Sequence, residues 1–285
     1  MNDKIAVIGA GTMGSGIAQI AVEAGFQVNL VDMEDAFVER GIGNIRKFIG
    51  KKVEKGKLTQ AQCDEIFSRL KGTTDMKQAV EGAVMVVEAV FEKYELKKEI
   101  FEKLDAMCSP EVILASNTST LSITNLAAAT KNPSRVIGTH YFSPVPAMRL
   151  VEVIRGKETS EATAQKTVDL CTKFGKTPIV VKDIPGFIVN RFLCLIYNEA
   201  ANMILNGSAG AEEIDQAMKL GCNWPMGITE IMDLAGVDVC AFAIEAMYQM
   251  TGEERYKPSP LFDKMLADKR LGRKTGKGFY DYEKK

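Results

Sequence analysis

The most constraining feature of the sequence is a glycine pattern between two short apolar runs near its start. Residues 4–8 predict a strand, and Gly9-Ala-Gly11-Thr-Met-Gly14 follows before a helical pattern. A second apolar run, residues 28–31, ends in Asp32, 18 residues after Gly14. Strand, G-x-G-x-x-G loop, helix, strand and acid in this order are typical of a dinucleotide-binding fold. We therefore predict an α/β chain with a Rossmann-type, mostly parallel sheet.

Each part of this motif has a physical task. Gly9 makes the turn, Gly11 lets the backbone approach a pyrophosphate, and Gly14 lets the helix pack on the strand. The helix amino terminus offers unpaired N–H groups to the phosphates. Asp32 can accept the ribose hydroxyls and would repel a 2′-phosphate, so NAD is favoured over NADP. The loop residues that we expect to contact NAD are Gly9, Gly11, Thr12, Met13 and Gly14.

A helical hairpin is predicted after this motif. Residues 35–57 have a helical pattern that becomes basic, and residues 59–70 form a second helical run with Thr59 as a candidate cap. Lys47, Lys51 and Lys55 are spaced by four and share one helix face. Spacing alone favours a solvated face, and the alternative is a docking face for a polyphosphate.

Strands and helices then alternate again, and polar side chains follow the strands. Residues 83–90 and 112–115 are nearly all apolar, as expected of parallel strands that are covered on both faces. The polar residues that follow them are Glu92 and Lys97 in one case, and Asn117 and Ser119 in the other. A turn with a helix cap is the commonest role for a run of small polar residues such as 116–120. Polar groups that converge on the carboxyl edge of one sheet nevertheless predict a site there.

The single histidine, His140, ends an apolar run at the same expected edge. A lone histidine is often structural, but an irregular Tyr-Phe-Ser-Pro-Val-Pro segment follows this one. Glu152 interrupts a second apolar run, residues 150–154, and a buried carboxylate needs a partner. An imidazole oriented by a carboxylate is a general base. We therefore expect His140 and Glu152 to satisfy each other.

The chain is predicted to divide at Pro185-Gly186, where strand patterns give way to helices. We expect an NAD-binding domain over residues 1–184 and an all-α domain over residues 185–285. The first helix of the second domain, 187–206, is apolar on most sides and must be covered by other helices or by a second subunit. Asn190 in its first turn is either a cap or a substrate contact.

Composition excludes several classes of protein. A net charge of −1 gives no indication of a nucleic-acid surface, and the apolar stretch 184–205 contains charged residues and asparagines that argue against a membrane span. The six cysteines have no metal-ligand spacing and there is one histidine, so we expect no metal site. Scattered cysteines, and a first strand that leaves no room for a targeting segment, indicate a cytoplasmic protein.

Six segments in order resemble the L-3-hydroxyacyl-CoA dehydrogenases over essentially the whole chain. They are GAGTMGSGIAQ, SNTSTLSI, GTHYFSPVPAMRLVEV, DIPGFIVNR, MKLGCNWPMG and KTGKGFYDY. The resemblance is strongest to the bacterial 3-hydroxybutyryl-CoA dehydrogenases of butyrate metabolism. It implies a reversible, NAD-linked interconversion of a 3-hydroxyacyl-CoA and its 3-keto thioester, with acetoacetyl-CoA and 3-hydroxybutyryl-CoA as substrates, and it implies a homodimer.

The resemblance also implies roles for individual residues. His140 matches the general base, and Glu152 matches the carboxylate that orients it. Ser119 and Asn190 match the groups that hold the substrate oxygen. Further NAD-contacting positions are matched by Glu92, Lys97, Asn117, Ser119 and Lys274, and CoA-phosphate contacts by Lys51 and Lys55, which reverses the interpretation from spacing alone.

Three positions differ from the commoner family pattern. The differing residues are Ser143, Trp224 and Ile228, which concern the shape of the acyl pocket.

Two other functions are alternatives to the one that the resemblance implies. The first is an NAD-linked, gulonate-type sugar-acid dehydrogenase, which would not need several cations far from the reacting carbon. The second is a non-catalytic NAD-binding protein, which would be free to lose its base, carboxylate or serine.

Overall fold

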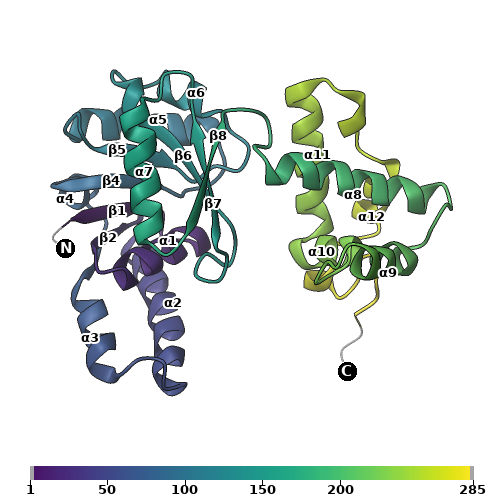
Figure 1. The fold of residues 1–285 in the computed structure, drawn as a ribbon, viewed down its shortest axis with the longest axis horizontal. Coiled ribbons are helices and arrows are strands. Elements are labelled where there is room, and N and C mark those ends of the chain that lie inside the picture. Colours follow the sequence, from purple (N-terminus) through teal and green to yellow (C-terminus); the bar gives the residue numbers. More distant parts are fainter. Residues whose placement is uncertain (1–2, 283–285) are drawn as a thin grey trace. The chain divides into compact units, whose positions relative to one another are not determined.

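The computed structural model describes residues 3–282 and consists of two compact units, which divide between Ile184 and Pro185 (Figure 1). The strands are β1 (Lys4–Ile8), β2 (Gln27–Val31), β3 (Leu70–Thr73), β4 (Ala83–Glu88), β5 (Ile113–Ser116), β6 (Val136–Tyr141), β7 (Leu150–Arg155) and β8 (Thr177–Lys182). The α-helices of the first unit are α1 (Thr12–Glu23), α2 (Asp35–Glu54), α3 (Gln60–Ser68), α4 (Met76–Val80), α5 (Tyr94–Met107), α6 (Ile123–Ala127) and α7 (Glu161–Lys173). Those of the second are α8 (Val189–Leu205), α9 (Ala211–Gly221), α10 (Ile228–Ala235), α11 (Val237–Thr251) and α12 (Pro260–Ala267).

The first unit is built on one eight-stranded sheet in the order β3-β2-β1-β4-β5-β6-β7-β8. Neighbouring strands are parallel, except that β6 and β7 are antiparallel. The strand order reverses between β1 and β4, and ligands of such sheets bind outside the carboxyl ends of strands at a reversal of this kind. The predicted Rossmann-type, mostly parallel sheet is therefore confirmed.

The central strands are apolar because both faces of the sheet are covered. All four residues of β5 are buried, and so are five of the six in β4. One hydrophobic core includes side chains of β1, β2, β4 and β5 together with the inner faces of α1 and α7. A carboxylate or imidazole in such a strand must find its partner within the protein.

Helices α2 and α3 form the predicted hairpin, which projects from the sheet (Figure 1). Thr59 caps α3 as predicted. Its side chain accepts a hydrogen bond from Gln62 N at 3.2 Å, and Gln62 Oε1 accepts one from Thr59 N at 2.9 Å. This reciprocal capping box begins the second helix of the hairpin.

The sequence pattern does not predict β3, because it indicates one helical run over residues 59–70. Helix α3 ends at Ser68, and Leu70 then pairs with Val28 at the edge of the sheet. The short segment offers one large apolar residue and no clear alternation. A Cβ on Gly72 would lie 2.4 Å from Val38 Cγ1, so the strand lies closely under α2. Pairing with β2, a tertiary contact, decides its conformation.

The helices and strands of the second unit up to Tyr282 are all helices, as predicted, and two isolated antiparallel bridges, Gly272 with Lys277 and Lys277 with Asp281, lie after α12. Its core contains buried side chains from α8, α10, α11 and α12. Two buried aspartates, Asp215 and Asp233, accept hydrogen bonds from the carboxyl-terminal segment. Asp233 accepts hydrogen bonds from Phe279 N at 2.9 Å and Tyr280 N at 3.0 Å, and Asp215 accepts one from the Tyr280 hydroxyl at 2.9 Å.

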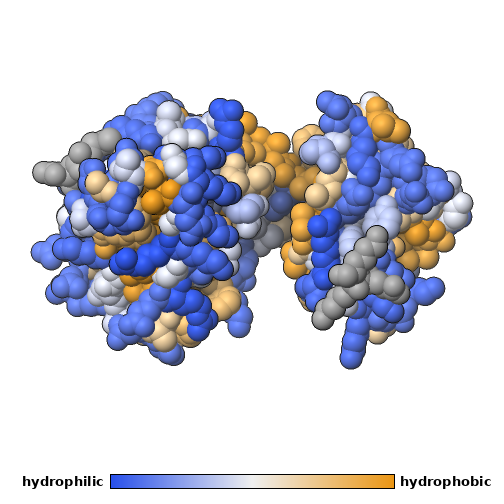
Figure 2. Space-filling model, turned by 90° about the horizontal axis from the view of Figure 1, so that it is seen from below, coloured by the Kyte–Doolittle hydropathy of each residue, from blue (hydrophilic) through white to orange (hydrophobic). Residues whose placement is uncertain are grey.

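On the face that Figure 2 shows, both units are mostly hydrophilic, with hydrophobic residues among the polar ones. On the helical unit the most exposed large hydrophobic side chains include Phe192 at 63%, Leu220 at 85% and Phe242 at 69%. Within residues 3–282, no helix has the length and apolar character that a membrane crossing requires.

Candidate active site

The glycine loop between β1 and α1 has the close contacts that its sequence predicts. Gly9 has φ +103°, and a Cβ there would lie 2.6 Å from Ala89 O. A Cβ on Gly14 would lie 1.7 Å from Gly9 O, so only glycine allows α1 to pack this close. A Cβ on Gly11 would meet no protein atom within 4 Å. The protein's own packing leaves the space beside Gly11 open, and a pyrophosphate at the amino terminus of α1 fits there.

Asp32 lies directly after β2 and faces the same loop. Its Oδ2 accepts a hydrogen bond from Ala10 N at 2.7 Å, and its Oδ1 accepts one from Met33 N at 2.7 Å. These two bonds hold the carboxylate at the carboxyl edge of the sheet beside the glycine loop. This is the position in which an acid can accept the ribose hydroxyls of NAD.

His140 and Glu152 form a buried pair, as the sequence predicts. They are direct partners in the antiparallel register of β6 and β7, and their side chains point to the same face. His140 Nδ1 lies 2.7 Å from Glu152 Oε2, and the two residues are 5% and 1% exposed. Because an ionised carboxylate only accepts hydrogen bonds, Nδ1 carries a proton. The other ring nitrogen, Nε2, is therefore the one able to exchange a proton with a substrate.

Ser119 lies next to that second nitrogen. Its Oγ is 3.1 Å from His140 Nε2. The segment that follows β5 therefore meets the end of β6, although 21 residues separate the two side chains in sequence. A hydroxyl and an imidazole nitrogen at this spacing can both contact one substrate oxygen.

Glu92 holds the turn on which Ser119 is placed. Its Oε1 accepts hydrogen bonds from Thr118 Oγ1 at 2.5 Å, Ser119 N at 2.8 Å and Thr120 N at 3.0 Å. Burial by itself raises the pKa of Glu92, but the Lys97 ammonium and these hydrogen bonds outweigh it, so the pKa of Glu92 is lowered. Glu92 is thus an anion that orders the Ser119 turn.

Lys97 is completely buried, which sequence reasoning did not anticipate. Its Nζ lies 2.8 Å and 3.0 Å from the two carboxylate oxygens of Glu88 and 3.3 Å from Glu92. Glu88, the main partner of Lys97, is likewise absent from the residues that the sequence predicts for the site. The available signal was an acid inside the apolar run 83–90, which is the same signal that identified Glu152.

Asn117 joins the ends of two strands at the same edge. Its N–H donates to Glu88 O at 2.7 Å, and its Oδ1 accepts from Tyr141 N at 3.0 Å. The side chain therefore fixes the end of β5 against the end of β6, one residue after His140.

Two predicted site residues belong to the helical unit. Asn190 lies in the first turn of α8 and is half-buried. Lys274 lies in a short 3₁₀ helix, and its Nζ contacts the Asp238 carboxylate at 2.5 Å and 2.7 Å. Of the family-pattern departures, Ser143 lies in the exposed loop between β6 and β7, and Ile228 is buried at the start of α10.

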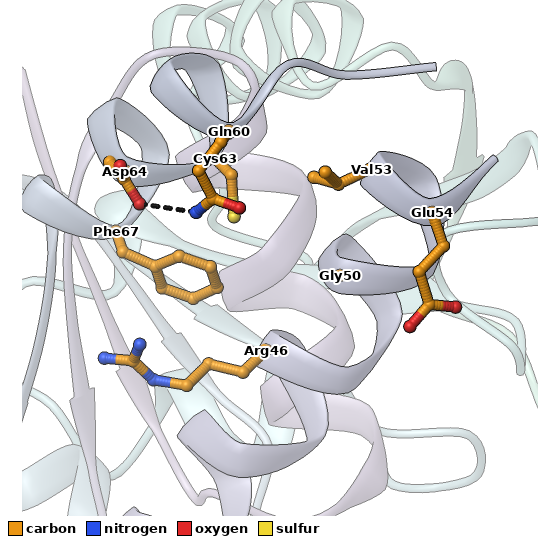
Figure 3. Close-up of a pocket in the computed structure, with 8 residues that line it drawn as sticks. All are labelled: Arg46, Gly50, Val53, Glu54, Gln60, Cys63, Asp64 and Phe67. Carbon is orange, nitrogen blue, oxygen red and sulfur yellow. Dashed lines mark hydrogen bonds between the residues drawn. The ribbon is translucent and has the colours of Figure 1, made fainter. Parts of the chain in front are cut away.

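Lys51 and Lys55 are exposed at the end of α2, whereas Lys52 is paired with Glu23 of α1 at 2.7 Å. A hollow of about 330 Å³ lies between α2 and α3 (Figure 3). In it the Arg46 guanidinium lies 4.6 Å from the centroid of the Phe67 ring. Neither exposed lysine lines this hollow, so the cationic surface of the hairpin is a different face of α2.

Comparisons with known proteins cover the whole chain. Residues 4–184 match the model of the 3-hydroxyacyl-CoA dehydrogenase NAD-binding domain, and residues 186–282 match the model of the C-terminal domain of the same enzymes. The first match agrees with the glycine loop and Asp32 geometry, and it establishes the first unit as an NAD-binding domain.

Individual relatives agree with these matches. A probable 3-hydroxybutyryl-CoA dehydrogenase of Bacillus subtilis is 45% identical over 99% of this chain and 98% of its own. The human mitochondrial hydroxyacyl-coenzyme A dehydrogenase is 41% identical over 98% and 91%. The crystal structure of (S)-3-hydroxybutyryl-CoA dehydrogenase from Ralstonia eutropha superposes with a TM-score of 0.96 at 42% identity, covering all of both chains.

Proposed function

The chain belongs to the 3-hydroxyacyl-CoA dehydrogenase family and is an NAD-dependent enzyme of that family, and we propose that its substrates are (S)-3-hydroxybutyryl-CoA and acetoacetyl-CoA, in butyrate and short-chain fatty acid metabolism. The supporting observation in the structure is the line of contacts from Glu152 through His140 to Ser119. Relatives named 3-hydroxybutyryl-CoA dehydrogenases, at 41–46% identity, support the short acyl chain.

His140 acts as the general base in this proposal. Oxidation of a secondary alcohol removes a proton and a hydride, and bound NAD supplies the hydride acceptor. His140 Nε2 takes the hydroxyl proton during oxidation and returns it to the ketone oxygen during reduction. Glu152 holds the ring by its Nδ1–H and stabilises the charge that the ring gains. Ser119 Oγ, 3.1 Å from Nε2, donates a hydrogen bond to the same substrate oxygen.

Residues outside this line hold the cofactor and the rest of the substrate. The glycine loop binds the pyrophosphate, and Asp32 accepts from the adenosine ribose. Glu92, Asn117 and Lys274 contact other parts of NAD. The ammonium of Lys97 is buried, so Lys97 acts on the cofactor site through Glu92. Asn190 contacts the substrate oxygen. Lys51 and Lys55 pair with the phosphates of CoA, which exposed ammonium groups at the end of α2 are suited to do.

The helical unit supports a proposal about assembly. Phe192 and Phe242 expose about two thirds of their side chains on it, with α8 and α11 contributing one each. Hydrophobic surfaces of this kind favour covering by another subunit. We propose a homodimer formed through residues 185–285, and sedimentation of a stable monomer would contradict it. We also propose a cytoplasmic location, since all six cysteines are free thiols.

The test is to follow the loss of NADH when purified protein is mixed with acetoacetyl-CoA, with a 3-keto sugar acid in parallel. We expect rapid loss with acetoacetyl-CoA that disappears in His140→Ala. Both proteins should bind NADH equally well, which shows that the variant is folded. Turnover of the sugar acid in preference to the thioester would contradict the proposed substrate.

A further inference from the structure

Glu88, at the carboxyl end of β4, is a fully buried acid to which no role has been given above. Its carboxylate accepts four hydrogen bonds. Lys97 Nζ provides two, Val90 N donates one at 2.7 Å, and Ser116 Oγ donates one at 2.6 Å. All three partners are donors, which is the arrangement that an ionised carboxylate requires.

Glu88, Lys97 and Glu92 form one cluster, which we call the edge triad. Lys97 Nζ contacts both carboxylates, and Glu88 and Lys97 have no exposed side-chain surface. Two carboxylates and one ammonium leave a net charge of −1. The buried charges of Glu88 and Lys97 are screened by salt much less than surface charges, whereas the Glu92 side chain is 35% exposed.

The edge triad lies directly behind the reacting groups. Glu92 Oε1, at one end of it, accepts the backbone N–H of Ser119 at 2.8 Å. Ser119 Oγ in turn lies 3.1 Å from His140 Nε2. Under the proposed function, hydride transfer requires the nicotinamide ring to lie against the substrate carbon whose oxygen meets Ser119 and His140. The ring therefore has to lie near the excess negative charge.

We propose that Glu88 sets the relative affinity of the protein for the two redox forms of its cofactor. The oxidised nicotinamide ring is a cation and the reduced ring is neutral, so a net charge of −1 stabilises NAD⁺ more than NADH. Glu88 touches neither substrate nor cofactor in this proposal, which rests on the proposed function. Glu88 acts through its contact with Lys97, which in turn contacts Glu92, and through the electrostatic potential that its charge produces at the nicotinamide ring.

The test is to measure the dissociation constants of NADH, by its fluorescence, and of NAD⁺, by displacement of NADH, in Glu88→Gln. This change keeps the shape of the side chain and removes the net charge of the edge triad. Coulomb's law at a separation of about 10 Å and an effective dielectric constant of about 20 to 40 predicts that the ratio Kd(NAD⁺)/Kd(NADH) rises roughly 4- to 15-fold. A purely structural defect would weaken both forms equally.

Three further variants separate charge from shape. Glu88→Asp keeps the charge and shortens the side chain, so its ratio should stay within about twofold of the wild type. Glu99→Gln removes the same charge from an exposed pair with Lys103 on the same helix and should leave the ratio unchanged. Glu92→Gln neutralises the other end of the edge triad and should raise the ratio, which provides the test if Glu88→Gln does not fold.

An unchanged ratio in both neutralised variants, or the same rise in Glu88→Asp, would overturn the inference. These measurements contain no acyl-CoA, so an enzyme that failed to reduce acetoacetyl-CoA would contradict the proposed substrate and leave the binding ratios valid. Wild-type protein that bound neither NAD⁺ nor NADH would overturn the cofactor assignment and this inference together.

Discussion

His140 Nδ1 donates a hydrogen bond of 2.7 Å to Glu152 Oε2 across the antiparallel pair of β6 and β7. The two residues lie opposite each other in register, so the backbone of the sheet sets the distance between their side chains. The bond assigns one ring nitrogen to Glu152 and directs the other toward Ser119. A general base with a fixed tautomer follows from this pairing.

Glu152→Gln should lower kcat strongly while the dissociation constant of NADH stays near that of the wild type. Glutamine keeps the shape but does not stabilise the imidazolium, and its amide can turn an N–H toward Nδ1. We expect a loss of roughly 100-fold, which is typical of disabling a general base. Glu158→Gln, at an exposed position after β7, is the matched control. Unchanged turnover in Glu152→Gln would remove Glu152 from the mechanism.

Replacing both Lys51 and Lys55 by Ala should raise the KM for acetoacetyl-CoA. Exposed charge pairs contribute up to about 1 kcal/mol each, so the expected rise is roughly 3- to 30-fold. The effect should shrink as salt is added, because the lost contacts are electrostatic. Lys166 and Lys173, exposed on α7, give a control double variant with the same change of charge. Equal KM values in the two double variants would contradict the CoA-binding role of the hairpin.

The wild-type enzyme should use NADH in preference to NADPH. A 2′-phosphate near the Asp32 carboxylate meets a like charge, and such a pair at about 4 Å repels by about 4 kcal/mol at an effective dielectric constant near 20. We expect at least roughly a 100-fold difference in kcat/KM. Asp32→Ser should narrow this difference by raising the NADPH value as well as lowering the NADH value. Equal kcat/KM values of the wild type for NADH and NADPH would show that Asp32 does not distinguish the 2′-hydroxyl from the 2′-phosphate.

The buried pair Asp105–Arg135 should make the first unit sensitive to acid. Burial alone would raise the pKa of Asp105, but hydrogen bonds from Arg135 and from Lys131 N outweigh it and lower that pKa below 3.8. A lowered pKa in the folded state means that the stabilisation is present above the unfolded pKa and is lost as pH falls through the folded one.

Asp105→Asn should therefore reduce the free energy of unfolding by about 3 kcal/mol at neutral pH, because it leaves the buried guanidinium without its anion. The difference from the wild type should narrow at a pH below 3.8, because the lowered pKa of Asp105 means that it takes up its proton in the wild type only there. Urea unfolding at both pH values measures this, with exposed Asp169→Asn as the control. A difference that stayed constant with pH would show that the charge of Asp105 is not the cause.

The parts of the fold that were predicted are those in which neighbouring residues decide the conformation. The glycine loop is one: the turn at Gly9 and the contact of Gly14 with Gly9 O involve residues five apart. The capping box of Thr59 and Gln62 is another, since both partners lie in one helical turn. By contrast, β3 was missed because Leu70 becomes part of a strand only by pairing with Val28, 42 residues earlier.

Within the site, the residue types can be predicted from the sequence: one histidine, acids inside apolar runs, and small polar residues after a strand. The sequence also indicated the edge of the sheet at which they meet, because parallel strands bring their carboxyl ends together. Apart from the His140–Glu152 pair, the partners of these side chains follow from the tertiary structure. Lys97 follows a strand at that edge, yet its ammonium lies inside the protein, because Glu88 and Glu92 together replace its hydration shell. Such pairing depends on burial and on distances across a strand, a turn and a helix, and linear spacing does not contain those quantities.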